Sequence, residues 1–149
     1  LDAANVAYDM NTVPLDPFRL ELGGGPELLL TASTHYNSSQ GYATIALVLG
    51  RNDRLELVDS VFNFDDSACA YDRIQRMDIA AGGDGPYADI LAAVHESTVP
   101  TGADCDGDTI PGPPERTIAV TYRWDAASSR YLPDSDAFDV LARENEQRF

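Results

Sequence analysis

The chain has 149 residues, of which 44% are hydrophobic, and its 25 acidic and 10 basic residues give a formal net charge of −15. This length is typical of one domain with a core of ordinary size, and no apolar run approaches the ~18 residues of a membrane-spanning helix. The negative charge disfavours binding to nucleic acid and anionic lipid, and favours cations or basic proteins as partners.

The first residues show little periodicity. Pro14 and Pro17 favour extended backbone, so we expect an N-terminal arm over residues 1–17 and one β-rich domain over residues 18–149. The chain starts without a basic and apolar leader, which fits either an exported protein whose signal peptide has been removed or a trimmed cytosolic one. Residues 18–22 alternate and predict a short strand.

Residues 27–64 predict three strands joined by two short polar turns. Apolar side chains recur there at every second position: Leu28, Leu30 and Ala32; Ile45, Leu47 and Leu49; Leu55 and Leu57. A period of two is typical of strands with one buried face. Residues 36–41 and 51–54 are rich in Asn, Asp, Ser and Gly, which favour turns. The segment therefore predicts an antiparallel meander.

The next segment is ambiguous between strand and helix. We expect a loop or helical turn over residues 65–72 and a strand over residues 74–80. In residues 87–97, Tyr87, Ile90, Leu91 and Val94 fit one helix face, but alternate positions also fit a strand. Because a Gly-rich turn joins two alternating runs, we predict a strand in a hairpin.

The last part of the chain predicts a long loop, a hairpin and a helix. Residues 98–115 form the loop, residues 117–124 and 130–132 form strands, and Ser135 caps a helix over residues 136–147 that packs Phe138 and Leu141 on the sheet. The predicted fold is therefore mainly β, an antiparallel meander or sandwich of six to eight strands with one C-terminal helix.

The end of the last hairpin carries a resemblance. Residues 121–125 read TYRWD and residues 130–133 read RYLP, after hairpins broken by Gly- or Asp-rich turns. Over residues 28–133 this pattern resembles uncharacterised exported bacterial β-proteins whose hairpins are similar to blades of integrin-type (FG-GAP-like) propellers. The resemblance assigns no functional residue, and 149 residues are too few for a closed propeller of four-stranded blades, which favours a sandwich or curled sheet.

The two cysteines, Cys69 and Cys105, predict one disulfide. They lie outside any CxxC spacing, and two lone thiols are a poor metal site. A disulfide places the protein in the periplasm or outside the cell, whereas the alternative is two unrelated buried thiols in a cytosolic protein.

An acidic loop around Cys105 gives a candidate calcium site. Asp104, Asp106 and Asp108 alternate, and Glu115 falls at position 12 counted from Asp104, as in an EF-hand loop. Thr109, however, stands where that loop needs Gly, and Pro-rich sequence follows in place of a helix. The alternative is a solvated acidic loop held by the disulfide.

Catalytic signatures are weak. His35 and His95 are the two histidines, and neither belongs to a GxSxG or HExxH motif, so both fit exposed strand ends better than a catalytic site. No phosphate-binding motif precedes a helix, and no carboxylate pair stands out as a glycosidase pair. A small hydrolase that uses carboxylates or these histidines in a cleft remains the alternative from another functional class.

Three aromatic residues near the last hairpin form a candidate ligand platform. Tyr122, Trp124 and Tyr131 fit a surface for a sugar or peptide, although aromatic residues on strands more often belong to the core or to cross-strand pairs.

Together these features predict a non-enzymatic exported protein that uses an acidic surface to bind a basic protein or a cell-envelope component. An inhibitor of a basic secreted hydrolase, such as a lysozyme, is one form of this hypothesis. The alternatives are the small hydrolase, a calcium-stabilised structural module, and an accessory domain without a specific partner. No cofactor other than calcium is expected.

Overall fold

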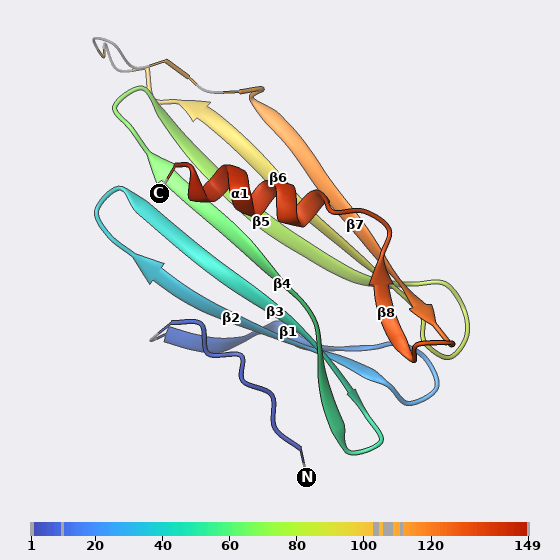
Figure 1. Ribbon diagram of the computed structural model, residues 1–149. Helices are drawn as coiled ribbons and strands as arrows, with labels where there is room; N and C mark the ends of the chain where they lie inside the picture. Colours follow the sequence, from blue (N-terminus) through green and yellow to red (C-terminus); the bar gives the residue numbers. More distant parts are fainter. Residues whose placement is uncertain (1, 10, 103–104, 106–108, 111, 149) are drawn as a thin grey trace.

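The computed structural model describes residues 2–9, 11–102, 105, 109–110 and 112–148. Eight strands follow one another as antiparallel neighbours in one sheet, and one helix follows them (Figure 1). The elements are β1 Asn11–Glu21, β2 Glu27–Tyr36, β3 Gln40–Arg51, β4 Arg54–Ser67, β5 Tyr71–Gly82, β6 Asp89–Pro100, β7 Glu115–Asp125, β8 Arg130–Pro133 and α1 Ala137–Glu146. The prediction of a mainly β meander with a C-terminal helix is confirmed.

Most of the predicted strands are present. The three-stranded meander forms β2, β3 and β4, and the ambiguous residues 87–97 fall largely in β6, which confirms a strand there. The predicted loop over residues 65–72 was wrong in part, because β4 continues to Ser67 and β5 begins at Tyr71. The N-cap of α1 is Asp136 rather than Ser135, and it makes no side-chain capping bond.

The first strand begins seven residues before the predicted strand at Phe18. β1 starts at Asn11, pairs with β2 as far as Pro14, and resumes at Arg19 after an irregularity in the register. An edge strand tolerates proline because one side of its backbone needs no partner. The predicted N-terminal arm therefore includes the first part of β1, and residues 2–9 precede that strand.

The sheet divides between β4 and β5. These two strands pair only through Asp66 with Arg73 and Ser67 with Asp72. Beyond these two pairs β4 and β5 are no longer hydrogen-bonded to each other. The first four strands and the last four then pack around one shared apolar core. The core side chains are Leu22, Leu28, Leu30, Ala32, Ile45, Leu47, Leu49 and Val61 from the first half; Ile90, Ala92, Val94, Val120, Tyr122 and Tyr131 from the second; and Phe138 and Leu141 from α1.

The C-terminal helix stabilises the divided sheet. Figure 1 shows α1 lying across the strands, and it packs on β4 and β7. Phe138 and Leu141 are buried in the core, as the sequence predicted, and Asn145 is buried one turn later. Asn145 Nδ2 donates a hydrogen bond of 2.9 Å to the carbonyl oxygen of Phe62 in β4. A side chain of α1 therefore satisfies a backbone group of β4 after β5 has moved away.

Candidate interaction surface

Residues 2–9 cover the outer face of the first half of the sheet around Ser33. Tyr8 N donates to Ser33 Oγ (3.1 Å), and Ser33 Oγ donates to the Val6 carbonyl (3.1 Å). Ser33 is fully buried, as is Ala46 on the adjacent strand. Since the core-facing side chains of β2 and β3 are their alternate neighbours, these two strands are buried on both faces around Ser33 and Ala46, whereas Leu57 of β4 is 46% exposed.

The outer face of β5, β6 and β7 is open by comparison in the described structure. Side chains on this face come from even positions of β5 and odd positions of β6 and β7, opposite to the core. Asp78, Ala93 and Ala119 lie side by side on the three strands. Together with Ala80, Leu91 and Thr121 they line a shallow hollow of about 350 Å³. The small alanine side chains make this face flat, and the Leu91 side chain is 44% exposed.

A polar hollow of about 600 Å³ adjoins the apolar one along the same strands. His95 lies at its centre: Nδ1 is 3.0 Å from Thr117 Oγ1, and Nε2 is 3.2 Å from Asp78 Oδ2. Glu115 and Arg76 also line it. The surface thus combines a small apolar area with hydrogen-bonding groups and carboxylates, a composition typical of protein interfaces with a polar rim.

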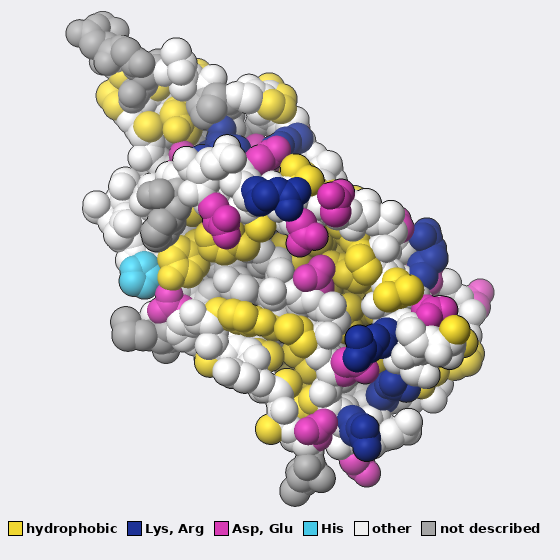
Figure 2. Space-filling model, viewed as in Figure 1, with side chains coloured by type: hydrophobic (Ala, Val, Ile, Leu, Met, Phe, Trp, Pro, Cys, Tyr) yellow, Lys and Arg dark blue, Asp and Glu magenta, His cyan; other side chains and the backbone are white. Residues whose placement is uncertain are grey.

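Most arginine side chains form ion pairs with carboxylates of the same chain. Figure 2 shows Arg and acidic side chains side by side over the visible face, not in separate patches. Within the described part of the chain, the arginines that form at least one ion pair with a carboxylate include Arg19, Arg51, Arg76, Arg116, Arg123, Arg130 and Arg148. Other carboxylates, including Asp72, Glu115 and Asp139, are exposed. The excess negative charge is therefore available to solvent and to a partner.

A buried carboxylate belongs to the scaffold and not to this surface. Glu96 is 4% exposed and accepts hydrogen bonds from Arg116 Nε (2.8 Å) and Gln75 Nε2 (2.7 Å). Burial acts to raise the pKa of Glu96, but these bonds and the charges of Arg116 and Arg148 outweigh it and hold the pKa below its usual value. Glu96 is therefore ionised at neutral pH and joins β5, β6 and β7.

The two histidines lie in different parts of the sheet. His35 is on β2, where its Nδ1 is 3.6 Å from Asp9 Oδ2, and its ring stacks on Tyr42. The Tyr42 hydroxyl donates to Asp9, and this bond raises the pKa of Tyr42. His95 is on β6, with the partners given above. Each histidine thus has its own carboxylate, and they do not share a cleft.

The predicted aromatic platform is mostly internal. Tyr122 is fully buried and donates to Asp59 Oδ2 (2.5 Å), and Tyr131 is 6% exposed. Trp124 is half-buried between ring neighbours, with Tyr87 stacked at 3.9 Å and the Arg51 guanidinium 4.7 Å from its ring centre. These side chains close the end of the core, as aromatic residues on strands often do.

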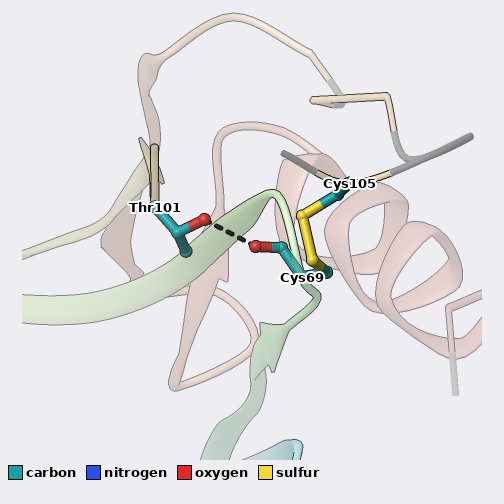
Figure 3. Close-up of a disulfide and its surroundings, with 3 residues drawn as sticks. All are labelled: Cys69, Thr101 and Cys105. Carbon is teal, nitrogen blue, oxygen red and sulfur yellow. Dashed lines mark hydrogen bonds between the residues drawn. A yellow bond between two sulfur atoms is a disulfide. The ribbon is translucent and has the colours of Figure 1, made fainter. Parts of the chain in front are cut away.

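Cys69 and Cys105 form a disulfide across a separation of 36 residues (Figure 3). Thr101 Oγ1 donates to the Cys69 carbonyl (2.5 Å), so the start of the long loop is held beside the bond. Asp104, Asp106 and Asp108 lie outside the described residues, and calcium binding stays a prediction. Glu115 begins β7 opposite Ser97. Among the described residues no three His, Cys, Asp or Glu side chains form a metal-binding group.

No protein-family model matches this chain, and no curated protein or solved structure is significantly similar to it. The resemblance to exported proteins with propeller-like hairpins therefore stays a prediction. In the described part of the chain, no helix has the length and apolar character needed to cross a membrane.

The sequence analysis does not predict the alanine side chains of the open face. Ala93 and Ala119 alternate with Val94 and Val120, and the strand prediction depends only on the larger apolar side chains. Small residues recurring on the outward positions of two neighbouring strands would have indicated a flat face.

Proposed function

We propose that this chain is an exported binding protein that presents the open outer face of β5, β6 and β7 to a basic protein. The observation that carries the proposal is the contrast between the two halves of the sheet. Residues 2–9 cover the outer face of the first half around Ser33, while the hollow around Ala93 and Ala119 is exposed.

Charge supports the kind of partner. The net charge of −15 favours association with a basic surface and steers its approach. Because the flat face is small and shallow, a protein surface fits it better than a small molecule, which needs a deeper pocket. The Cys69–Cys105 disulfide fits an oxidising compartment, where basic secreted hydrolases such as lysozymes are found as partners to inhibit.

The test is association with lysozyme as a basic probe, at low and high salt. We expect an association rate that falls steeply as salt rises, together with a loss of lytic activity. Ala93→Arg places a long cation in the hollow and should abolish binding, whereas Ala127→Arg changes the net charge equally in the exposed β7–β8 turn and should leave most of it. Equal binding by the two variants, or a salt-independent rate, would contradict the proposal.

A small hydrolase is the second candidate, favoured by the contact of Asp9 with His35 and Tyr42. A carboxylate that orients an imidazole is a common part of acid–base sites. Hydrolysis of a panel of ester and glycoside substrates, lost in His35→Ala and kept in His95→Ala, would support it. No hydrolysis by the unsubstituted protein would exclude it for those substrates.

Calcium stabilisation of the acidic loop is a separate proposal. If Asp104, Asp106 and Asp108 bind calcium, the melting temperature rises on adding calcium and returns with EDTA, because binding to the folded state stabilises it. An unchanged melting temperature would leave these residues as a solvated loop.

A further inference from the structure

The two edges of the sheet are protected differently. β1 carries Pro14 and Pro17 and an irregularity before Arg19. Proline and bulges prevent other strands from pairing with an edge. At the other side, β8 is four residues long and pairs with β7 only from Tyr122 to Asp125.

Residues 115–119 of β7, named here the β7 edge, therefore lie beyond β8. Figure 1 shows no strand alongside this part of β7. The β7 edge has no proline, and its register with β6 is regular. In the described residues it has none of the proline or bulge devices that protect β1.

The backbone of β7 has a defined orientation at this edge. Asp134 N donates to the Thr121 carbonyl (2.9 Å), and Thr121 N donates to Asp134 Oδ1 (2.9 Å). Thr121 thus directs both backbone groups away from β6. Since these directions alternate along a strand, Ala119 and Thr117 direct theirs the same way. No hydrogen-bond partner for these groups is present in the described part of the chain.

A groove runs beside the β7 edge on its inner side. It has a volume of about 290 Å³ and lies between β7 and α1. Ile118, Ala137 and Val140 give it an apolar surface, and Asp136 adds a carboxylate. Glu144 also lines it, paired at 2.7 Å with the Arg116 side chain. The Val140 side chain is 39% exposed.

We infer that the β7 edge receives an extended basic segment of the partner protein as an additional antiparallel strand, an inference that rests on the proposed function. Backbone groups of Thr117 and Ala119 pair with the segment. Alternate side chains of the segment enter the groove beside Val140 or lie on the open outer face near Glu115. A second copy of this chain is a poor occupant, because its own charge of −15 repels it.

The probe is a short labelled peptide of alternating lysine and valine, with its binding followed by fluorescence anisotropy. The control peptide has the same sequence with every backbone nitrogen methylated, so that charge and side chains stay while the N–H donors are lost. We expect the control to bind at least about tenfold more weakly, as the loss of two or so backbone hydrogen bonds predicts.

A matched pair of protein variants tests whether the backbone of the β7 edge forms these hydrogen bonds. Ala119→Pro removes the N–H that faces the edge, and Ala119→Val keeps it while adding bulk. The proline variant should bind the lysine–valine peptide about tenfold more weakly than the valine variant, because both enlarge the side chain in the hollow and only the proline variant lacks the N–H. If the proline variant does not fold, the comparison of the two peptides with the unsubstituted protein still tests the inference.

The outcomes separate the inference from the proposed function. Equal binding of the two peptides, with lysozyme binding still sensitive to Ala93→Arg, would overturn strand addition and leave the proposed function in place. Failure of both the lysine–valine peptide and lysozyme to bind would contradict both.

Discussion

The side-chain amides of Gln75 and Asn145 bind each other reciprocally. Gln75 Nε2 donates to Asn145 Oδ1 and Asn145 Nδ2 donates to Gln75 Oε1, each at 3.0 Å. Gln75 Oε1 also accepts from Phe64 N (2.9 Å), and Asn145 Nδ2 donates to the Phe62 carbonyl. The two amides thus supply to β4 the hydrogen bonds that β5 would have made, and they allow the sheet to divide.

Loss of either amide should destabilise the fold strongly. Gln75→Leu removes the side-chain acceptor of the buried Phe64 N–H and one hydrogen-bond donor to the Glu96 carboxylate, and we expect the free energy of unfolding to fall by about 2–4 kcal/mol. Asn145→Leu should have a similar effect. Urea unfolding measures both, with Gln147→Leu, at the exposed C-cap of α1, as the control. A change as small as that of the control would mean that the amide pair contributes little.

Stability should fall in acid because of Glu96. Its pKa is lower in the folded state than the usual 4.5, so its contribution is present above that pH and is lost as the pH falls through the folded-state value. Glu96→Gln should be less stable at neutral pH and should lose less stability between neutral pH and acid. Glu115→Gln is the control, and identical pH profiles for the unsubstituted protein and Glu96→Gln would contradict the prediction.

Two buried tyrosines predict loss of stability at high pH. Burial raises the pKa of Tyr131 to about 12, aided by the charge of Asp89, and burial with the bond to Asp59 raises the pKa of Tyr122 further. The stability they confer is present below pH 10, the usual value, and declines as the pH rises above it. Tyr131→Phe should show a shallower decline between pH 10 and 12 in thermal melts. An unchanged slope would argue against this assignment.

The disulfide should stabilise the protein substantially. Closing a loop across the 36-residue separation reduces the entropy of the unfolded chain, for which the chain-entropy model gives about 3–4 kcal/mol. We expect the double substitution Cys69→Ala with Cys105→Ala to lower the melting temperature, and reduction of the unsubstituted protein to do the same. No effect of reduction on the melting temperature, with free thiols confirmed, would contradict this.

Alternation along the chain was enough to predict the strands with one apolar face. It predicted β2 and β3 from Leu28 to Leu49, and it favoured a strand in β6. It does not predict the first part of β1, because Pro14 and Pro17 interrupt the alternation although an edge strand accepts them.

The division of the sheet could not be predicted in this way. Gln75 and Glu96 occupy core-facing positions on β5 and β6, where alternation alone predicts apolar residues. Their partners, Asn145 and Arg116, are far away in the sequence, and only the folded chain brings these side chains together. Which half of the sheet has an open outer face depends on where residues 2–9 pack. Their contact with Ser33 also joins residues that are far apart in the sequence.

The central claim is that the second half of the sheet, and not the first, is the binding surface. The most direct measurement is an NMR titration that follows every backbone amide as lysozyme is added to the isotope-labelled protein. We predict shifts or line broadening at Ala93, Thr117 and Ala119, while Ser33 and Ala46 beneath residues 2–9 remain unchanged. Changes centred on Ser33 and Ala46, with β6 and β7 unaffected, would contradict the account.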